Sequence, residues 1–275
     1  MIRRDRLMVV GHPVKQSLSP IMHNAALDAL GIDTRYSAVD VQPAMLEDFL
    51  RAASSTRCGG NFTIPHKRAA MSSMARVSDI ARMAGSVNTF WSDGDGVLHG
   101  DNTDVAGFEA AIVDLCGEIP TGVNVAVVGA GGSAAAVLTA VQRWPSATAC
   151  VHGRSPEKLE SIRSRFSVVT RTAAVSDRSL SRADIVVNAT PIGMVTRELP
   201  FPVEYLRPDA AVLDLVYGEN ETLLVQRARA AGHLAADGLR MLLHQGVAAF
   251  SRWYDVQPDA SVMWNALLTA TGRQM

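Results

Sequence analysis

The stretch "NVAVVGAGGSAAAVLTAVQRW", residues 124–144, decides the fold. A short apolar run is typical of a buried strand, a glycine turn follows it, and an alanine-rich helix comes next. The turn fits the pattern G-x-G-x-x-A at Gly129, Gly131 and Ala134. Strand, glycine turn and helix in this order favour a doubly wound, Rossmann-type unit that binds a dinucleotide.

Each small residue of this turn has a physical role. Gly129 makes the tight turn, Gly131 lets the backbone approach a pyrophosphate, and Ala134 permits close packing of helix on strand. The anion would rest on the N–H groups at the helix start. The alternative is a glycine turn without a ligand, but the complete βα unit that follows favours binding. The predicted cofactor contacts here are Gly129, Ala130, Gly131, Gly132, Ser133 and Ala134.

The next strand ends in "VHGRSPEK", residues 151–158, and this loop indicates which dinucleotide is bound. A free ribose 2′-hydroxyl would normally meet an Asp or Glu at the strand tip, and none stands there. Arg154, Ser155 and Lys158 instead supply two cations and a hydroxyl, which suits the 2′-phosphate of NADP. A solvated loop with ordinary charges is the alternative. We predict NADP rather than NAD.

Strand-like and helix-like segments alternate along the whole chain, which predicts an α/β protein with mostly parallel sheets. We expect an N-terminal α/β substrate domain of residues 1–103 plus 239–275 and an NADP-binding domain of residues 104–238. The last two helices, near 238–254 and 259–271, should return to the first domain. In that domain we expect strands at 7–10, 34–41 and 58–64, helices at 19–31 and 43–53, and a hairpin turn near 93–96.

Bulk composition limits the partners. The 275 residues are 48% hydrophobic, carry a formal charge of −1 and have a pI near 6.7, so no global field draws the chain to nucleic acid or to a membrane. Three separated cysteines fit a reducing compartment, and the N-terminal apolar run is too short for a signal peptide, so we expect a cytoplasmic protein with buried thiols. The seven histidines show no metal-ligand spacing, and we assign no metal. Monomer and homodimer both stay open.

The stretch "GNFTIPHK", residues 60–67, raises a separate question. In a strand, Asn61 and Thr63 would share one face, while Phe62 and an isoleucine would share the other. Pro65 would stop the strand, and Lys67 would stand where a helix begins. A strand that ends in hydrogen-bonding groups with a lysine at its tip resembles the wall of a polar binding site.

Several stretches together resemble the shikimate dehydrogenase family over nearly the whole chain. They are "SLSP" with Ser17 and Ser19, "NFTIPHK" at 61–67, "SVNT" with Asn88, "GDNTD" with Asp104, "GAGGSA" at 129–134, "NATPIGM" at 188–194 and "DGLRMLLHQ" at 237–245. Each stretch alone would be unremarkable, and the order and spacing are specific. The resemblance implies a reversible, NADP-linked reduction of 3-dehydroshikimate to shikimate.

The resemblance also implies roles for individual residues. Ser17, Ser19 and Tyr217 would hold the substrate carboxylate, and Asn61, Thr63, Asn88, Asp104 and Gln245 would bind the ring hydroxyls. Thr190, Val216 and Gly238 would contact the cofactor, with Gly238 near the nicotinamide. The predicted substrate residues are mostly neutral donors and acceptors, which suits a small hydroxylated carboxylate.

Lys67 and Asp104 are the predicted catalytic pair. Hydride transfer at a carbon requires a proton to move at the attached oxygen, and a lysine can donate it. Asp104 would orient the lysine and favour its charged form. Taken singly, a lysine at a helix start is usually a surface charge, an aspartate there is usually a cap, and the serines beside Pro20 could serve only as a cap and turn. Which member of the pair carries the proton stays open.

Some positions depart from the family pattern, and other functions stay open. Phe62 replaces a smaller residue, Gly153 and Lys158 replace an Asn and an Arg, and Arg240 replaces a frequent glycine near the predicted nicotinamide. The last change is compatible with a paralogue that acts on quinate or aminoshikimate. A non-catalytic sensor is the more distant alternative, and the presence of both Lys67 and Asp104 argues against it.

Overall fold

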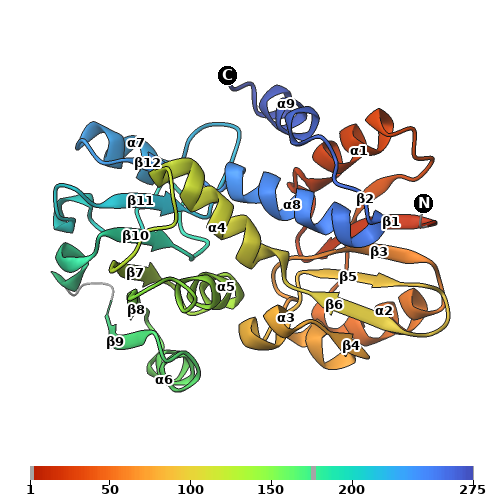
Figure 1. Ribbon diagram of the computed structural model, residues 1–275, viewed down its shortest axis with the longest axis horizontal. Coiled ribbons are helices and arrows are strands. Elements are labelled where there is room, and N and C mark those ends of the chain that lie inside the picture. The colour runs from red at the N-terminus through yellow and green to blue at the C-terminus, as the bar shows by residue number, and fades with distance from the viewer. Residues whose placement is uncertain (1–2, 175–177, 275) are drawn as a thin grey trace. The chain divides into compact units, whose positions relative to one another are not determined.

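The computed structural model describes residues 3–174 and 178–274. They form two compact α/β units, Met1–Gly107 with Leu242–Met275 (unit 1) and Phe108–Met241 (unit 2) (Figure 1). The units divide inside two helices, α4 (Thr103–Cys116) and α8 (Leu239–Tyr254), a few residues from the boundaries that the motifs indicated. The C-terminal segment belongs to unit 1, as predicted.

Unit 1 contains a six-stranded mixed sheet in the order β2-β1-β3-β5-β6-β4. Its strands are β1 (Arg6–Gly11), β2 (Tyr36–Asp40), β3 (Cys58–Phe62), β4 (Arg76–Val77), β5 (Thr89–Ser92) and β6 (Leu98–Asp101). The first three strands pair in parallel, whereas β5 pairs antiparallel with β3 and β6. The hairpin predicted near residues 93–96 is therefore confirmed. Strand β4 was not predicted.

The remaining elements of unit 1 refine three predictions. The helices are α1 (Ser19–Ala29), α2 (Leu46–Ser54), α3 (Asp79–Ala84) and α9 (Ala260–Thr271), with short 3₁₀ turns η1 (Pro43–Met45) and η2 (Ala69–Ser73). Ser19 does not cap α1, because Leu18 holds the cap position without a side-chain bond. The helix expected from Pro43 begins as η1. Ile64 lies beyond β3 and is 53% exposed, so it does not share the buried face of Phe62.

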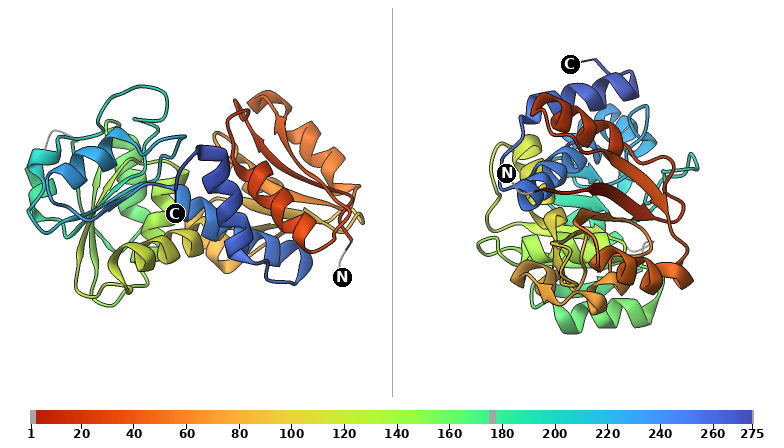
Figure 2. Two further views of the ribbon diagram at one scale, coloured as in Figure 1. Left: turned by 90° about the horizontal axis from the view of Figure 1, so that it is seen from above. Right: turned by 90° about the vertical axis from the view of Figure 1, so that its right-hand side faces the viewer.

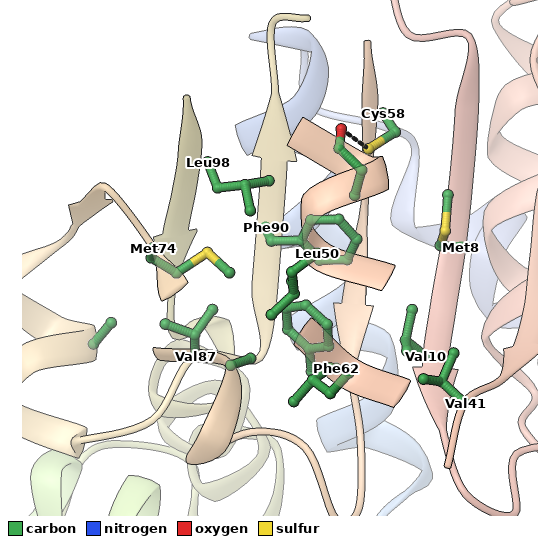
Figure 3. Close-up of a cluster of buried hydrophobic side chains, with 14 residues drawn as sticks. Met8, Val10, Val41, Leu50, Cys58, Phe62, Met74, Val87, Phe90 and Leu98 are labelled. Carbon is green, nitrogen blue, oxygen red and sulfur yellow. Dashed lines mark hydrogen bonds between the residues drawn. The ribbon is translucent and has the colours of Figure 1, made fainter. Parts of the chain in front are cut away.

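One face of the unit 1 sheet carries an apolar core beneath α2 (Figure 3). Phe62 of β3 and Phe90 of β5 stack with their ring centroids 4.5 Å apart, and Leu50 of α2 joins the same cluster. Burying large aromatic side chains is the main stabilising contribution in a core of this kind. The cluster fixes the position of β3, because alternate residues of this strand must then point to the other face.

The other face of this sheet meets the helices that return from the C-terminus. In Figure 1 α9 runs beside α1, and Figure 2 shows the same pairing of the dark blue and red helices. Trp253 of α8 donates its ring N–H to the carbonyl of Phe90 at 3.1 Å and packs on Gly59, where a Cβ would lie 3.0 Å from its ring. Asn61 shares the sheet face of Gly59, which places a polar group beneath α8 and α1.

Unit 2 is a doubly wound unit around a six-stranded parallel sheet, ordered β12-β11-β10-β7-β8-β9. The strands are β7 (Asn124–Val128), β8 (Thr148–His152), β9 (Val169–Ala173), β10 (Ile185–Asn188), β11 (Ala211–Asp214) and β12 (Ala235–Ala236). The helices are α5 (Gly132–Val141), α6 (Pro156–Arg165) and α7 (Leu223–Ala230), with 3₁₀ turns η3 (Arg178–Arg182) and η4 (Val203–Tyr205). This order confirms the predicted Rossmann-type topology.

Two further features bear on the environment of the chain. No helix among the described residues is long and apolar enough to cross a membrane. The three cysteines form no disulfide with any described residue: Cys58 is buried as expected, whereas Cys116 and Cys150 are only half-buried.

Candidate active site

Lys67 and Asp104 form an ion pair in unit 1, with Lys67 Nζ 2.7 Å from Asp104 Oδ2. Lys67 follows the turn after β3, and its carbonyl accepts a hydrogen bond from Val87 N at 2.8 Å. Asp104 stands in the first turn of α4. The two side chains are 17% and 6% exposed. Lys67 is thus not a solvated surface charge, and the carboxylate of Asp104 is engaged by side chains from other segments.

Asn88 holds the second oxygen of the Asp104 carboxylate. Its Nδ2 donates to Asp104 Oδ1 at 2.8 Å, and its Oδ1 accepts from Thr103 N at 2.7 Å. The same Nδ2 lies 3.4 Å from Gln245 Oε1 on α8. Both carboxylate oxygens therefore have donors, and one of these donors carries the positive charge. Satisfied buried networks of this kind fix side-chain orientation, so the lysine is held in one place.

Asn61 continues this network along β3. Its Nδ2 donates to Asn88 O at 3.2 Å and to Thr89 Oγ1 at 3.0 Å, while its Oδ1 accepts from the Tyr36 hydroxyl at 2.8 Å. Asn61 is 5% exposed. The structure thus links four of the predicted site residues, Asn61, Asn88, Asp104 and Lys67, with Gln245 at the margin. Tyr36 and Thr89 were missed, because nothing in their local sequence separates them from ordinary strand residues.

Ser17 lies in the loop between β1 and α1, Ser19 is the first residue of α1, and Thr63 directly follows β3. The Ser17 hydroxyl accepts a hydrogen bond from Ser19 N at 3.3 Å, and Thr63 N donates to Val10 O at 2.9 Å. A Cβ on Gly11 would lie 2.4 Å from the Thr63 methyl group, so this approach of the two strand ends requires a glycine. No hydrogen bond among the described residues joins any of the three to Lys67 or Asp104, and their role in substrate binding stays a prediction.

The glycine turn of unit 2 has the conformation that its motif predicts. Gly129 has a φ of +125°, and a Cβ there would lie 2.8 Å from the carbonyl oxygen of Ala189. Gly131 holds the cap position of α5 and contributes no side-chain hydrogen bond. Apart from its two neighbours in the chain, no described residue has an atom within 4 Å of the place where its Cβ would stand. Ala134 is fully buried, so the helix packs closely on the sheet.

Ser155, in the loop after β8, has protein partners of its own, and its role in phosphate binding stays a prediction. The Ser155 hydroxyl accepts from Lys158 N at 3.3 Å, which caps α6, and donates to Glu157 Oε2 at 2.7 Å. This bond lowers the pKa of Glu157. Arg154 and Lys158 are exposed and are the cations of the loop. Sequence reasoning missed Glu157, which stands beside them and is read from sequence only as a first-turn helix residue.

A buried polar cluster lies at the carboxyl ends of β10 and β11. Asn188 Nδ2 donates to Asp214 Oδ1 at 2.8 Å, and Asn188 Oδ1 accepts from both Thr190 N at 3.0 Å and Thr190 Oγ1 at 2.7 Å. Val216 N donates to Asp214 Oδ1 at 3.1 Å. Burial raises the pKa of Asp214 to about 6. Sequence reasoning missed the role of Asp214, although a polar residue that ends an apolar strand is a usable signal.

Gly238 and Tyr217 complete the predicted residues of unit 2. Gly238 N donates to Val216 O at 3.0 Å, and a Cβ on Gly238 would lie 2.3 Å from Leu215 O, so only glycine fits. Tyr217 is half-buried and lines a pocket of about 440 Å³. Its predicted partners Ser17 and Ser19 belong to unit 1, and a shared role stays a prediction.

Arg240, the departure near the predicted nicotinamide, has a partner of its own. Its Nε lies 3.8 Å from Asp114 Oδ2 on α4. Both side chains are partly exposed, so the pair contributes little to stability. The side chain is thus directed to α4.

Comparisons with known proteins agree with this geometry. The model of the shikimate dehydrogenase substrate binding domain matches residues 9–90, and that of the shikimate 5′-dehydrogenase C-terminal domain matches residues 238–268. A shikimate dehydrogenase (NADP(+)) of Mesorhizobium japonicum is 40% identical over 96% of both chains.

Two solved structures are similar over nearly the whole chain. Shikimate 5-dehydrogenase from Thermus thermophilus in complex with NADP(H) and shikimate has a TM-score of 0.87 and 35% identity, over 96% of this chain and 99% of that one. Quinate dehydrogenase from Corynebacterium glutamicum in complex with NAD has a TM-score of 0.87 and 32% identity, over 97% and 99%. The resemblance inferred from the motifs is confirmed: the chain belongs to the shikimate dehydrogenase family.

Proposed function

We propose that the protein is an NADP-dependent shikimate dehydrogenase, which reversibly reduces 3-dehydroshikimate to shikimate in aromatic amino-acid biosynthesis. The observation that carries the proposal is the ion pair between Lys67 and Asp104, within the network of Asn88 and Asn61. Curated relatives with this name span nearly the whole chain, which supports the substrate and the cofactor. The free thiols fit a reducing compartment, so the proposal includes a cytoplasmic location.

Unit 2 fits a dinucleotide. The first N–H groups of α5 receive no hydrogen bond from a capping side chain. Atoms of the other described residues leave the space beside Gly131 open to a ligand. Unpaired N–H groups at a helix start bind anions such as a pyrophosphate. Arg154 and Lys158 would hold the 2′-phosphate of NADP, while Thr190, Val216 and Gly238 would form the nicotinamide end. When bound, NADP supplies or accepts the hydride.

Lys67 would move the proton at the substrate oxygen. In the direction of reduction its ammonium donates a proton to the carbonyl oxygen as the carbon accepts the hydride. In the reverse direction the amine takes the hydroxyl proton. Asp104 holds the amine through its 2.7 Å contact, and Asn88 fixes the carboxylate from the other side. The reacting oxygen would thus meet one oriented acid.

Asn61, Thr63, Asn88 and Gln245 would bind the ring hydroxyls, and Ser17, Ser19 and Tyr217 would bind the carboxylate. Asn61 retains acceptor capacity, because its Oδ1 receives one donor, Tyr36, and a carbonyl-type oxygen can receive two. The half-buried hydroxyl of Thr63 supplies a donor and an acceptor beside it. This donor set suits a hydroxylated ring rather than an apolar ligand.

Quinate or aminoshikimate is the second candidate substrate. The similarity to a quinate dehydrogenase, at 32% identity, supports this alternative. Quinate has one more hydroxyl near its carboxylate and would need more room beside Ser17 and Ser19. The two candidates share Lys67 and Asp104, so they differ in substrate preference and not in the proposed proton transfer.

Activity assays with each combination of substrate and dinucleotide test the proposal. The purified protein is mixed with shikimate or quinate, each with NADP⁺ or NAD⁺, and reduced-nicotinamide absorbance is followed. We expect the highest kcat/KM for shikimate with NADP⁺. A higher value for quinate would favour the paralogue. Binding of the ligands without turnover of any pair would identify a sensor and refute the enzymatic proposal.

A further inference from the structure

Asp214 is a fully buried carboxyl in unit 2 that neither predicted site uses. It ends β11 and has no solvent exposure. The donors to its Oδ1 are neutral: the Asn188 side-chain amide at 2.8 Å and the Val216 backbone N–H at 3.1 Å. The charged group that acts on it is Asp237, just beyond β12, which is also negative. A buried carboxylate without a cation is costly, so its retention calls for a physical reason.

Three predicted cofactor residues are connected to this carboxyl by hydrogen bonds. Thr190 is bound to Asn188 through both its N–H and its hydroxyl, and Asn188 is bound to Asp214. Val216 donates directly to Asp214, and its carbonyl accepts from Gly238 N at 3.0 Å. One side chain thus fixes the ends of two adjacent strands and the turn before α8.

The hydrogen bonds do not require the negative charge. Both donors meet Oδ1, and an asparagine at this position offers the same acceptor. Burial raises the pKa of Asp214 to about 6, while the Thr222 hydroxyl and the two N–H donors offset this only in part. At neutral pH the group therefore carries most of a full negative charge in an interior of low dielectric.

We propose that Asp214 is a positioning residue for the nicotinamide end of the cofactor site, and that its charge favours the oxidised over the reduced dinucleotide. The oxidised nicotinamide ring is a cation and the reduced ring is neutral, so a buried negative charge nearby stabilises the oxidised form selectively. This inference rests on the proposed function, because it requires Val216 and Gly238 to contact the nicotinamide.

Binding without substrate tests the inference apart from turnover. Dissociation constants of NADP⁺ and NADPH are measured by calorimetry for the wild type and for Asp214→Asn at pH 7.5. We expect Asp214→Asn to weaken NADP⁺ binding roughly tenfold more than NADPH binding, the size of one charge interaction across a protein interior. Asp209→Asn is the matched control, because Asp209 is an 85% exposed aspartate of the same unit. It should leave both constants unchanged.

The pH dependence of the wild type gives a test that needs no variant. The preference for NADP⁺ over NADPH should decline as the pH falls through about 6, where Asp214 gains its proton. The 2′-phosphate titrates in the same range, but both forms carry it, and its effect cancels in the ratio. In Asp214→Asn the ratio should be independent of pH.

Each outcome decides one statement. Equal weakening of both forms would leave Asp214 a structural residue and overturn the charge effect, and so would an unchanged ratio at all pH values. Unchanged constants in Asp214→Asn would also overturn the charge effect, and unchanged constants in Asp214→Ala, which lacks the acceptor of both hydrogen bonds, would overturn the positioning role. Failure of the wild type to bind either dinucleotide would refute the proposed function itself, which is a distinct result.

Discussion

Two buried aspartates, Asp104 in unit 1 and Asp214 in unit 2, are held in opposite ways. Asp104 faces an ammonium at 2.7 Å and an amide at 2.8 Å. Asp214 receives neutral donors only, lies near a second carboxylate and has a pKa raised to about 6 by burial. Within the described part of the chain, a cationic side chain compensates the first charge and none compensates the second.

The difference indicates what each charge does. A compensated pair holds both groups in one orientation, which suits a proton donor that must stay in place. An uncompensated carboxylate lowers stability, so it suits a site where the compensating cation arrives with a ligand. Substitutions that remove one of these charged groups at a time test this difference.

Removing the ammonium should have the largest effect. Lys67→Ala should lower kcat for shikimate oxidation by roughly 10²- to 10⁴-fold, the usual contribution of a positioned acid or base. NADP⁺ binding and the circular dichroism spectrum should be unchanged. Arg68→Ala is the matched control, because Arg68 is an exposed cation next in sequence, and it should keep full activity. Near-normal turnover of Lys67→Ala would exclude this lysine from the chemistry.

Neutralising the carboxylate of the pair should have the next largest effect. Asp104→Asn keeps an acceptor for Asn88 but leaves Lys67 without its counter-charge. We expect kcat to fall by about 10²-fold, within the range for acid–base groups. Steady-state rates between pH 6 and 10 check this result. A variant that loses only affinity for shikimate, with kcat intact, would make Asp104 a binding residue and not a partner of the acid.

Removing a cation from the loop after β8 should have a smaller effect, and this effect should fall on cofactor binding. Arg154→Ala should raise the KM for NADP⁺ roughly tenfold, the contribution of a hydrogen bond between charged groups, and should hardly change the KM for NAD⁺. Arg163→Ala, at an exposed position of α6, the helix that follows this loop, is the control. An equal rise for both dinucleotides would refute the assignment of Arg154 to the 2′-phosphate.

Neutralising Asp214 should change the stability of the protein. The pKa of Asp214 is about 6 in the folded protein and 3.8 ordinarily, so the folded state binds the proton more tightly than the unfolded state. The contribution of this proton to the free energy of unfolding is complete below pH 3.8 and is lost as the pH rises through 6. At pH 7 Asp214→Asn should therefore be more stable than the wild type, by up to about 3 kcal/mol. Urea midpoints from pH 4 to pH 8 measure this difference. A variant less stable at pH 7 would show that the charge is compensated.

Secondary structure could be predicted from the sequence where an apolar run is followed by a recognisable motif. The run 125–128 with its glycine turn predicted β7, α5 and the parallel order of unit 2. The strands that were missed, β4, β9 and β12, all lie at sheet edges. Strands β4 and β12 have two residues each, and β9 contains three polar residues among its five, so none of them carries the apolar run that marks a central strand.

The candidate site was predictable in part for a similar reason. Motif spacing brought Lys67, Asn88 and Asp104 into one hypothesis, and their contacts agree with it. Tyr36 and Asp214 could not be found in this way, because their roles depend on partners that only the tertiary structure brings near. The bonds of the Ser155 hydroxyl to α6 and to Glu157 could not be predicted either, while its predicted contact with the 2′-phosphate stays a prediction.

A double-mutant cycle on the pair tests the central claim most directly. The kcat of Lys67→Ala, Asp104→Asn and the double variant is measured with shikimate and NADP⁺ at one pH. If the two groups act as one acid–base unit, the double variant should be no slower than Lys67→Ala alone. Losses that multiply in the double variant would show two independent roles and contradict the proposed pair.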